Sequence, residues 1–244
     1  MNYKKIPSLL LLLFLAFMVN AQQPKKLSTI AAWKIGYQLD FGSTERQLAP
    51  DKDGHQEQSV MIELAKALSG SSDDTPPLIC YVSPNYIRVE QNGLGGGITV
   101  ADKRDTLSYL LDTAAKTAVK YPAEIPNLHT QLNEDSLVVI SSEGFKMELQ
   151  KDTSSIGGQL CKKAIFTNPD FPQNVITVWY APALPRLYWQ KYSYLKTVPG
   201  CALSIGTISK GVNVGIKAKL VEKVDVPESF FKPPSDFAIS EGMF

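Results

Sequence analysis

Residues 33–41 read WKIGYQLDF, and a large apolar side chain stands at every second position of this stretch. The apolar members are Trp33, Ile35, Tyr37, Leu39 and Phe41. Successive side chains of a β-strand point to opposite faces, so a period of two predicts a strand with one buried face and one wet face. One wet face is typical of antiparallel sheets, because parallel sheets are covered on both sides and read as continuous apolar runs.

The same alternation recurs further along the chain. Residues 212–220 read VNVGIKAKL, and the apolar side chains of Phe145, Met147 and Leu149 also stand two positions apart. Shorter apolar segments bounded by turn residues predict further strands at 78–82, 86–91, 98–101, 107–111, 117–121, 137–140, 160–167 and 175–180. Roughly ten strands with short connections predict a mainly β fold that is built as an antiparallel meander.

Helix evidence is limited to residues 58–69. Apolar side chains recur there at the spacing of one helix face and Gly70 follows the segment, whereas Val60, Ile62 and Leu64 alternate as in a strand. Both interpretations stay open. No stretch has the composition of a domain linker, so residues 22–244 are expected to form a single β-rich domain.

The first 21 residues have the three parts of a secretory signal peptide. Lys4 and Lys5 give a positive start, residues 9–19 form an apolar run, and Ala21 stands at the predicted cleavage point. The apolar run is shorter than the ~20 residues of a membrane-spanning helix, which argues against the alternative of a membrane anchor. We therefore expect an exported protein, periplasmic or secreted, without a transmembrane segment after cleavage.

Composition argues against several classes of function. The chain has 25 Lys and Arg residues against 24 Asp and Glu, so it lacks the basic surplus of a nucleic-acid-binding protein and no nucleic-acid partner is expected. His55 and His129 have no second His or Cys at a metal-ligand spacing, so neither a metal site nor a cofactor is expected. Because no Gly-x-Ser-x-Gly elbow is present, a hydrolase is only a distant alternative to a non-enzymatic protein.

The three cysteines indicate environment more than chemistry. Exported proteins fold in an oxidising compartment, and three thiols leave one unpaired if a disulfide forms. Cys161 and Cys201 each stand near the opening of a predicted strand, so a Cys161–Cys201 disulfide would join the two strands if they are neighbours. The alternative is that all three cysteines are reduced and buried, as expected for Cys80 within the apolar segment 78–82.

Four blocks of the sequence resemble the GLPGLI family and related envelope proteins with a lipoprotein-carrier-like fold. The blocks are 155–164 (SIGGQLCKKA), 175–182 (VITVWYAP), 198–203 (VPGCAL) and 226–237 (VPESFFKPPSDF). Of the motif that gives the family its name, this chain keeps the turn Pro199-Gly200. The resemblance implies a strongly curved antiparallel sheet, like a half-open barrel, whose apolar concave face is partly covered by a lid of helix or loop.

In the carrier relatives the concave face receives the acyl chains of lipoproteins, which implies an apolar ligand, a lipid or an acyl chain, for this chain too. Residues 188–195 read YWQKYSYL and contain four aromatic side chains, and this segment is our candidate for a lid or for the lip of a pocket. The expected ligand-binding residues are Trp179, Tyr188, Trp189, Tyr192 and Leu195. Ordinary packing of a crossing loop onto the sheet is the alternative interpretation of this segment.

Two hypotheses about function follow. The leading one is a non-enzymatic exported protein that binds an apolar ligand in the concave face of its sheet, without a cofactor. The alternative is a structural or interaction module of the cell envelope, in which the sheet packs closed and an edge strand or a loop binds a protein partner.

Overall fold

The computed structural model describes residues 28–41, 76–93, 96–123, 129–133, 136–140, 144–169, 171–209 and 212–242. Its strands are β1 (Thr29–Asp40), β2 (Leu78–Val82), β3 (Tyr86–Gln91), β4 (Gly97–Asp102), β5 (Leu107–Asp112), β6 (Thr117–Pro122), β7 (His129–Asn133), β8 (Ser136–Ile140), β9 (Lys146–Ile156), β10 (Gln159–Asn168), β11 (Phe171–Ala181), β12 (Cys201–Ser209), β13 (Val212–Pro227) and β14 (Ala238–Glu241). Between them lie the short 3-10 helices η2 (Gln190–Thr197) and η3 (Glu228–Phe231).

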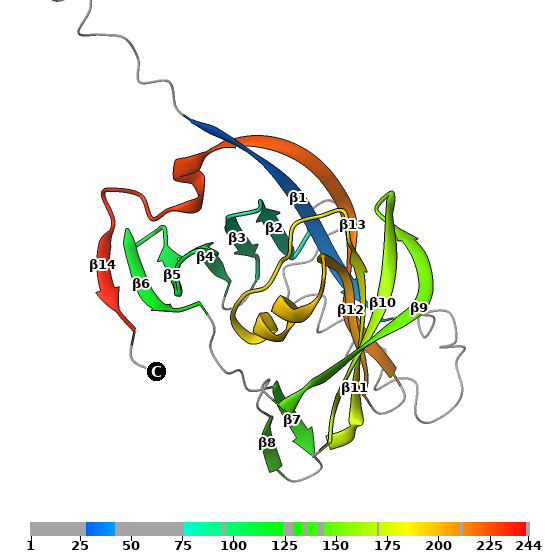
Figure 1. The fold of residues 1–244 in the computed structure, drawn as a ribbon. Helices are drawn as coiled ribbons and strands as arrows, with labels where there is room; N and C mark the ends of the chain where they lie inside the picture. The colour runs from blue at the N-terminus through cyan, green and yellow to red at the C-terminus, as the bar shows by residue number, and fades with distance from the viewer. Residues whose placement is uncertain are drawn as a thin grey trace, which may run out of the picture.

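Twelve of the strands form one sheet, in the order β14-β6-β5-β4-β3-β2-β1-β13-β12-β11-β10-β9, and β7 pairs with β8 in a separate hairpin. The central pair, β1 and β13, runs antiparallel along the whole of β1. On each side of it the strands form an antiparallel meander, while β14 crosses to the far edge and pairs in parallel with β6. Figure 1 shows the two meanders on either side of the long β1 and β13 ribbons.

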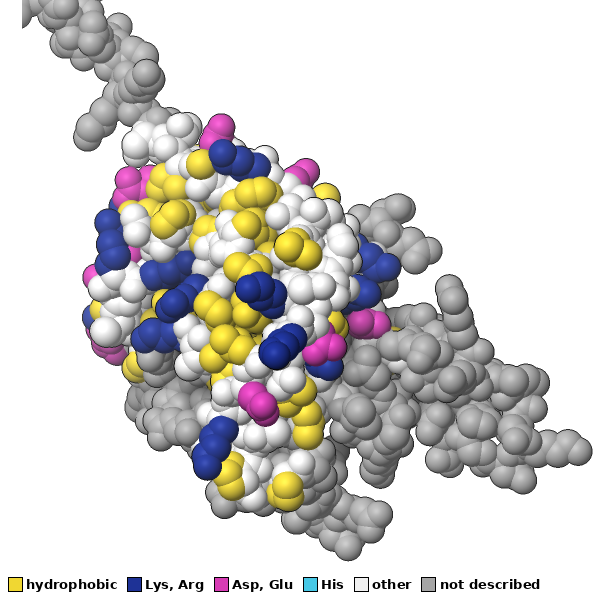
Figure 2. Space-filling view, turned by 45° about the vertical axis from the view of Figure 1, so that its right-hand side comes forward, with side chains coloured by type: hydrophobic (Ala, Val, Ile, Leu, Met, Phe, Trp, Pro, Cys, Tyr) yellow, Lys and Arg dark blue, Asp and Glu magenta, His cyan; other side chains and the backbone are white. Residues whose placement is uncertain are grey.

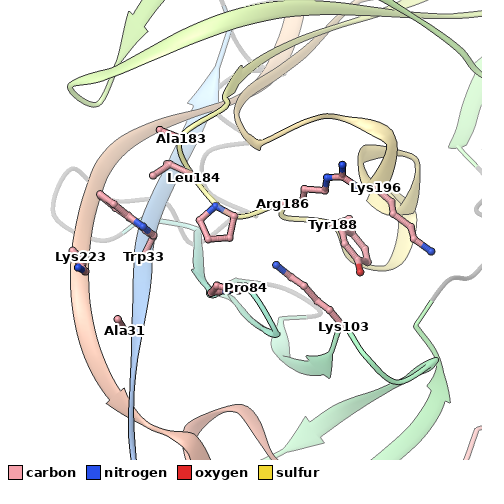
Figure 3. A pocket seen from close by; sticks show the side chains of 11 residues that line it. Ala31, Trp33, Pro84, Lys103, Ala183, Leu184, Arg186, Tyr188, Lys196 and Lys223 are labelled. Carbon is pink, nitrogen blue, oxygen red and sulfur yellow. The ribbon is translucent and has the colours of Figure 1, made fainter.

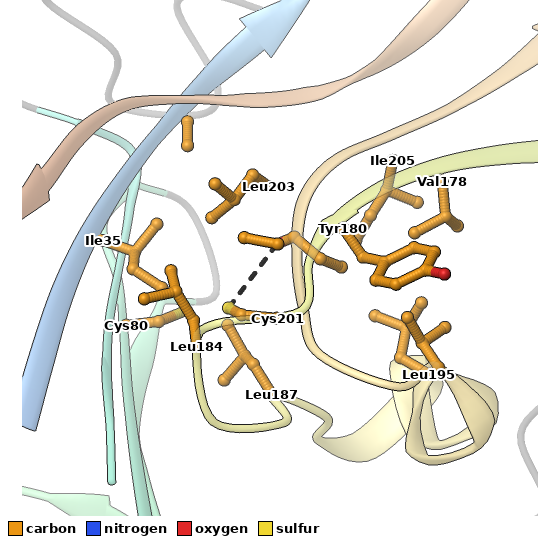
Figure 4. Packing of buried hydrophobic residues seen from close by; sticks show 14 of the residues in the cluster. Ile35, Cys80, Val178, Tyr180, Leu184, Leu187, Leu195, Cys201, Leu203 and Ile205 are labelled. Carbon is orange, nitrogen blue, oxygen red and sulfur yellow. Dashed lines mark hydrogen bonds between the residues drawn. The ribbon is translucent and has the colours of Figure 1, made fainter. Parts of the chain in front are cut away.

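The alternation of side chains decides which face of the sheet carries the main core. In β1, Ile35 and Tyr37 are fully buried, whereas Lys34 and Gln38 are only partly buried. Strands β10, β11 and β12 bring buried apolar side chains such as Val178 to the same core. Figure 4 shows how side chains from these strands and from the segment after β11 pack together.

The chain between β11 and β12 fills the space on this face. Residues 182–200 leave the sheet, form η2 and return, and in Figure 1 this yellow segment lies between the two meanders. Its apolar side chains are part of the main core; they are Leu184, Leu187, Trp189, Tyr194, Leu195 and Val198. This segment therefore buries the apolar face of the sheet, which would otherwise be exposed to water.

The 3-10 helix η3 covers part of the opposite face. Phe231 of η3 is buried with Ala32 and Tyr86 in a second, smaller cluster. Ala32 and Ile35 differ by an odd number of positions along β1, so their side chains point to opposite faces of the strand.

The structure confirms a mainly β protein with one large, mostly antiparallel sheet and very little helix. The expected half-open barrel is wrong in detail, because the sheet is neither closed nor strongly curled: its edge strands β14 and β9 lie at opposite ends of the strand order. The physical reason is that residues 182–200 cover the apolar face, so the sheet does not have to wrap around itself to bury it.

Two sequence-based predictions fall on parts of the chain outside the described residues. These are the signal peptide over residues 1–21 and the helix or strand over residues 58–69. Among the residues that are described, no helix has the length and apolar character needed to cross a membrane.

Candidate ligand-binding site

A cavity of about 620 Å³ lies beside the main core, between the β1–β13 pair and residues 183–188. We call it the Trp33 pocket. One part of its wall is apolar or aromatic and consists of Ala31, Trp33, Pro84, Ala183, Leu184, Pro185 and Tyr188. Figure 3 shows these side chains around one open space, into which β1, the β2–β3 turn and the segment after β11 all project. A volume of this size is within the range of pockets that bind small molecules.

The apolar wall follows from the local structure. Trp33 continues the inward-facing series of Ile35 and Tyr37 toward the N-terminal end of β1, where the core ends. Pro84 lies in the β2–β3 turn. Two hydrogen bonds hold the shape of this turn: the Ser83 N–H donates to the Tyr86 carbonyl, and the Tyr86 N–H donates to the Ser83 hydroxyl. Strand β1 and the hydrogen-bonded β2–β3 turn therefore fix the positions of Trp33 and Pro84 in this wall.

The rest of the wall is basic. Lys103, Arg186, Lys196 and Lys223 line the pocket, and no acidic side chain is found among the described residues that line it. They come from four parts of the fold, namely the β4–β5 turn, the segment after β11, η2 and β13. Figure 2 shows the related pattern on one whole face of the molecule, where Lys and Arg side chains stand beside an apolar band.

Lys103 is the most enclosed of the four basic residues. Its ammonium donates a hydrogen bond to the Ser83 carbonyl at 2.6 Å, and its backbone N–H donates to the Asn85 carbonyl at 2.7 Å. Burial lowers the pKa of Lys103 to about 8; Cys201 opposes this shift and the Arg186 guanidinium adds to it. Within the described part of the chain, Lys103 has no carboxylate partner.

The residues expected to bind a ligand do not form one site. Tyr188 lines the Trp33 pocket. Trp189 (4% exposed) and the fully buried Leu195 pack in the main core, and the Tyr192 ring lies 4.5 Å from that of Trp189, between centroids. Trp179 is partly buried against the main core and lines a separate hollow of about 350 Å³. The aromatic segment 188–195 thus packs mainly as a crossing segment and reaches the pocket through Tyr188.

The predicted Cys161–Cys201 disulfide is absent, since all three cysteines are buried free thiols. Cys161 lies on β10 and Cys201 on β12, with β11 between them, so the condition that the two strands be neighbours is not met. Lys162 opposes Tyr180 and Ala181 opposes Cys201, which places the two cysteines two strand spacings apart, about 9.5 Å. A disulfide requires Cα atoms within roughly 7 Å.

The described residues contain no group of three or more His, Cys, Asp or Glu side chains that could hold a metal ion. Of the two histidines, His55 lies outside the described residues and His129 is placed on β7 only as a backbone position.

None of the four basic lining residues was foreseen; these are Lys103, Arg186, Lys196 and Lys223. The sequence marks Lys103 only as part of a turn and Lys223 only as a position in a strand. The one available signal is that Arg186 and Lys196 stand on either side of the aromatic segment 188–195. The other lining residues could not be predicted from the sequence, because they come from segments that are far apart in the chain and meet only in the folded sheet.

Comparisons with known proteins leave the chain without a family assignment. No protein-family model and no curated protein matches it. Among solved structures, those of PNGF-II in the C2 and P21 space groups resemble it distantly, each with a TM-score of 0.48 and 14% sequence identity. Each match covers 87% of this chain but 31% of the other, so the chain spans about a third of PNGF-II. The resemblance to the GLPGLI family stays a prediction from the sequence.

Proposed function

We propose that this protein is a non-enzymatic, exported binding protein, periplasmic or secreted, that holds an apolar ligand such as a lipid or an acyl chain in the Trp33 pocket. The observation that carries the proposal is a cavity of about 620 Å³ with an apolar and aromatic part of its wall, which includes Trp33, Leu184 and Tyr188. An alkyl chain that enters it is removed from water, which is worth about 0.8 kcal/mol for each buried CH₂ group.

The position of the pocket supports the proposal. Trp33 and Tyr188 lie at the boundary of the main core and are only partly buried. A ligand in the pocket extends the core by covering the faces that these rings leave exposed. Export is supported by the sequence of residues 1–21, and an envelope location gives such a protein access to lipids.

The test uses 1-octanol as a neutral probe and Ala183→Phe as a variant that fills the pocket. Titration followed by tryptophan fluorescence is expected to show saturable binding to the wild type, and Ala183→Phe is expected to weaken it about tenfold or more. Ala114→Phe is the matched control, because Ala114 is an exposed residue in the β5–β6 turn. Its affinity for octanol should equal that of the wild type.

Native mass spectrometry of gently purified protein gives a second reading. A retained apolar molecule that is lost in Ala183→Phe supports the proposal. The proposal fails if octanol does not bind in a saturable way, or if the pocket-filling variant binds it as well as the control does.

One observation favours the alternative of an envelope interaction module. Strand β9 is an edge of the large sheet, and two leucines of the β9–β10 hairpin are strongly exposed, Leu149 at 52% and Leu160 at 69%. An open edge with apolar side chains can accept a strand from another protein. Capture of a defined envelope partner that depends on Leu149 and Leu160 but not on Ala183 would favour this function over ligand binding.

A further inference from the structure

The basic residues of the Trp33 pocket call for an explanation, because the chain as a whole is almost neutral. Composition alone does not place Lys103, Arg186, Lys196 and Lys223 around one cavity, and none of the described lining residues is acidic. A wall of this kind attracts anions and repels cations. A purely apolar ligand would gain no electrostatic interaction with these basic side chains.

Lys103 has the geometry of an anchor for an anion. An ammonium group has three N–H donors, and in the described part of the chain only one of them has an acceptor, the Ser83 carbonyl. The hydrogen bond from the Lys103 backbone to Asn85 holds the β4–β5 turn against the β2–β3 turn, so the base of the side chain is fixed. Figure 3 shows the side chain directed into the space between Pro84 and Tyr188.

The surroundings of Lys103 disfavour its charge. Burial lowers the pKa of its ammonium to about 8, and the Arg186 guanidinium lowers it further against the opposing effect of Cys201. A negatively charged group placed beside both cations reverses this effect, since opposite charges within about 4–6 Å favour the charged form. An anion beside Lys103 would therefore offset the cost of burying its charge.

The two kinds of wall together define one class of ligand. Trp33, Leu184 and Pro185 offer an apolar surface, while Lys103 and Arg186 offer charge-assisted hydrogen bonds at another part of the same cavity. We propose that the ligand is an anionic amphiphile, with a carboxylate or phosphate head held by Lys103 and Arg186 and an apolar body against Trp33. This inference rests on the proposed function and adds the charge of the ligand to it.

Four probes of equal chain length test the charge. They are octanoate, octyl phosphate, 1-octanol and octyltrimethylammonium, and isothermal titration at low salt measures their affinity. We expect octanoate or octyl phosphate to bind at least about tenfold more tightly than octanol, and the cation to bind most weakly. Whichever anion binds more tightly distinguishes a carboxylate head from a phosphate head. Raising the salt concentration should reduce the preference for the anion, because Lys196 and Lys223 are exposed and screened.

The variants assign the preference to Lys103. Lys103→Gln should lose about tenfold in affinity for the preferred anion and keep its affinity for octanol. The matched control is Lys162→Gln, which removes an exposed lysine from β10 and should change neither. Circular dichroism checks that Lys103→Gln is folded; Arg186→Gln, at an exposed position, gives an independent reading of the same preference.

The outcomes separate the two proposals. Equal affinity for octanol and both anions, or an anion preference that survives both Lys103→Gln and Arg186→Gln, overturns this inference and leaves the proposed function standing. Absence of binding by all four probes overturns the proposed function and this inference with it. Loss of the preference in both pocket variants but not in Lys162→Gln supports the anionic amphiphile.

Discussion

At the scale of single residues, Cys201 combines complete burial with polar neighbours. It lies at the start of β12 in the main core, and the hydroxyl of Tyr37 donates a hydrogen bond to the carbonyl of Ala202 next to it. Burial raises the pKa of the Cys201 thiol to about 12 from an ordinary value of 9.0, although hydrogen bonding to Tyr37 and the charge of Lys103 act in the other direction. The thiol is therefore an uncharged core group at neutral pH.

This shift predicts a loss of stability in alkaline solution. Above pH 9 the unfolded chain releases the Cys201 proton and the folded protein keeps it, so the free energy of unfolding falls as the pH rises from 9 toward 12. Urea unfolding at pH 7 and pH 10 should show that Cys201→Ala loses about 1 kcal/mol less than the wild type over this interval. An equal loss in both proteins would show that Cys201 does not contribute.

At the scale of elements, the β9–β10 hairpin depends on two glycines. Ile156 pairs with Gln159, which leaves Gly157 and Gly158 as a two-residue loop with φ values of +56° and +75°. Positive φ at both loop positions matches the twist of the flanking strands and is accessible mainly to glycine. Gly157 also faces β13, because a Cβ added to it would lie 2.5 Å from Val221 Cγ2, whereas a Cβ at Gly158 would meet nothing within 4 Å.

The two glycines should therefore differ when each is replaced by alanine. Gly158→Ala adds only the cost of a left-handed backbone, about 1–2 kcal/mol of unfolding free energy. Gly157→Ala adds the collision with the stiff Val221 side chain, so its loss should be larger by about 1 kcal/mol or more. Urea denaturation of the two variants measures the difference, and equal losses would mean that β13 does not press against the hairpin.

At the scale of the whole molecule, one continuous sheet joins two clusters that lie on opposite faces. The Trp33 pocket and all three tryptophans are associated with the main core, while Phe231 and Tyr86 belong to the smaller cluster under η3. The Tyr86 ring stacks on Phe231 with centroids 5.4 Å apart, and its hydroxyl donates to Glu228 at 2.9 Å. Strand β1 contributes side chains to both clusters, Ile35 to the main core and Ala32 to the smaller one.

This connection predicts that damage to the smaller cluster is felt in the main core. Phe231 is 2% exposed, so Phe231→Ala should lower the free energy of unfolding by about 3–5 kcal/mol. Tryptophan fluorescence and circular dichroism should report a single transition at the same lowered urea midpoint. The control, Ile239→Ala in β14, removes a side chain that is 58% exposed and should change little. Two separate transitions would show that the clusters unfold independently.

The local pattern of the chain predicted the strands well and their surroundings poorly. Alternation at Ile35 and Tyr37 identified β1 and its buried face, because a period of two is a local property of an extended backbone. The position of β11 between Cys161 and Cys201 was not accessible in this way, so the sequence left open whether these cysteines form a disulfide or stay reduced and buried, as the structure has them. Strand order depends on pairings between residues far apart in sequence, which no local pattern records.

The candidate site divides in the same manner. The sequence by itself determined that the chain forms strands with one apolar face and that residues 188–195 form an aromatic segment, since both features follow from residues that are neighbours in the chain. Only the tertiary structure decided that residues 182–200 fill the face of the sheet, so that Trp189 and Leu195 became core. It also decided that Lys103 and Lys223 meet Arg186 around one cavity. The reason is physical: turns and strands from distant parts of the chain acquire a common wall only when the sheet aligns them.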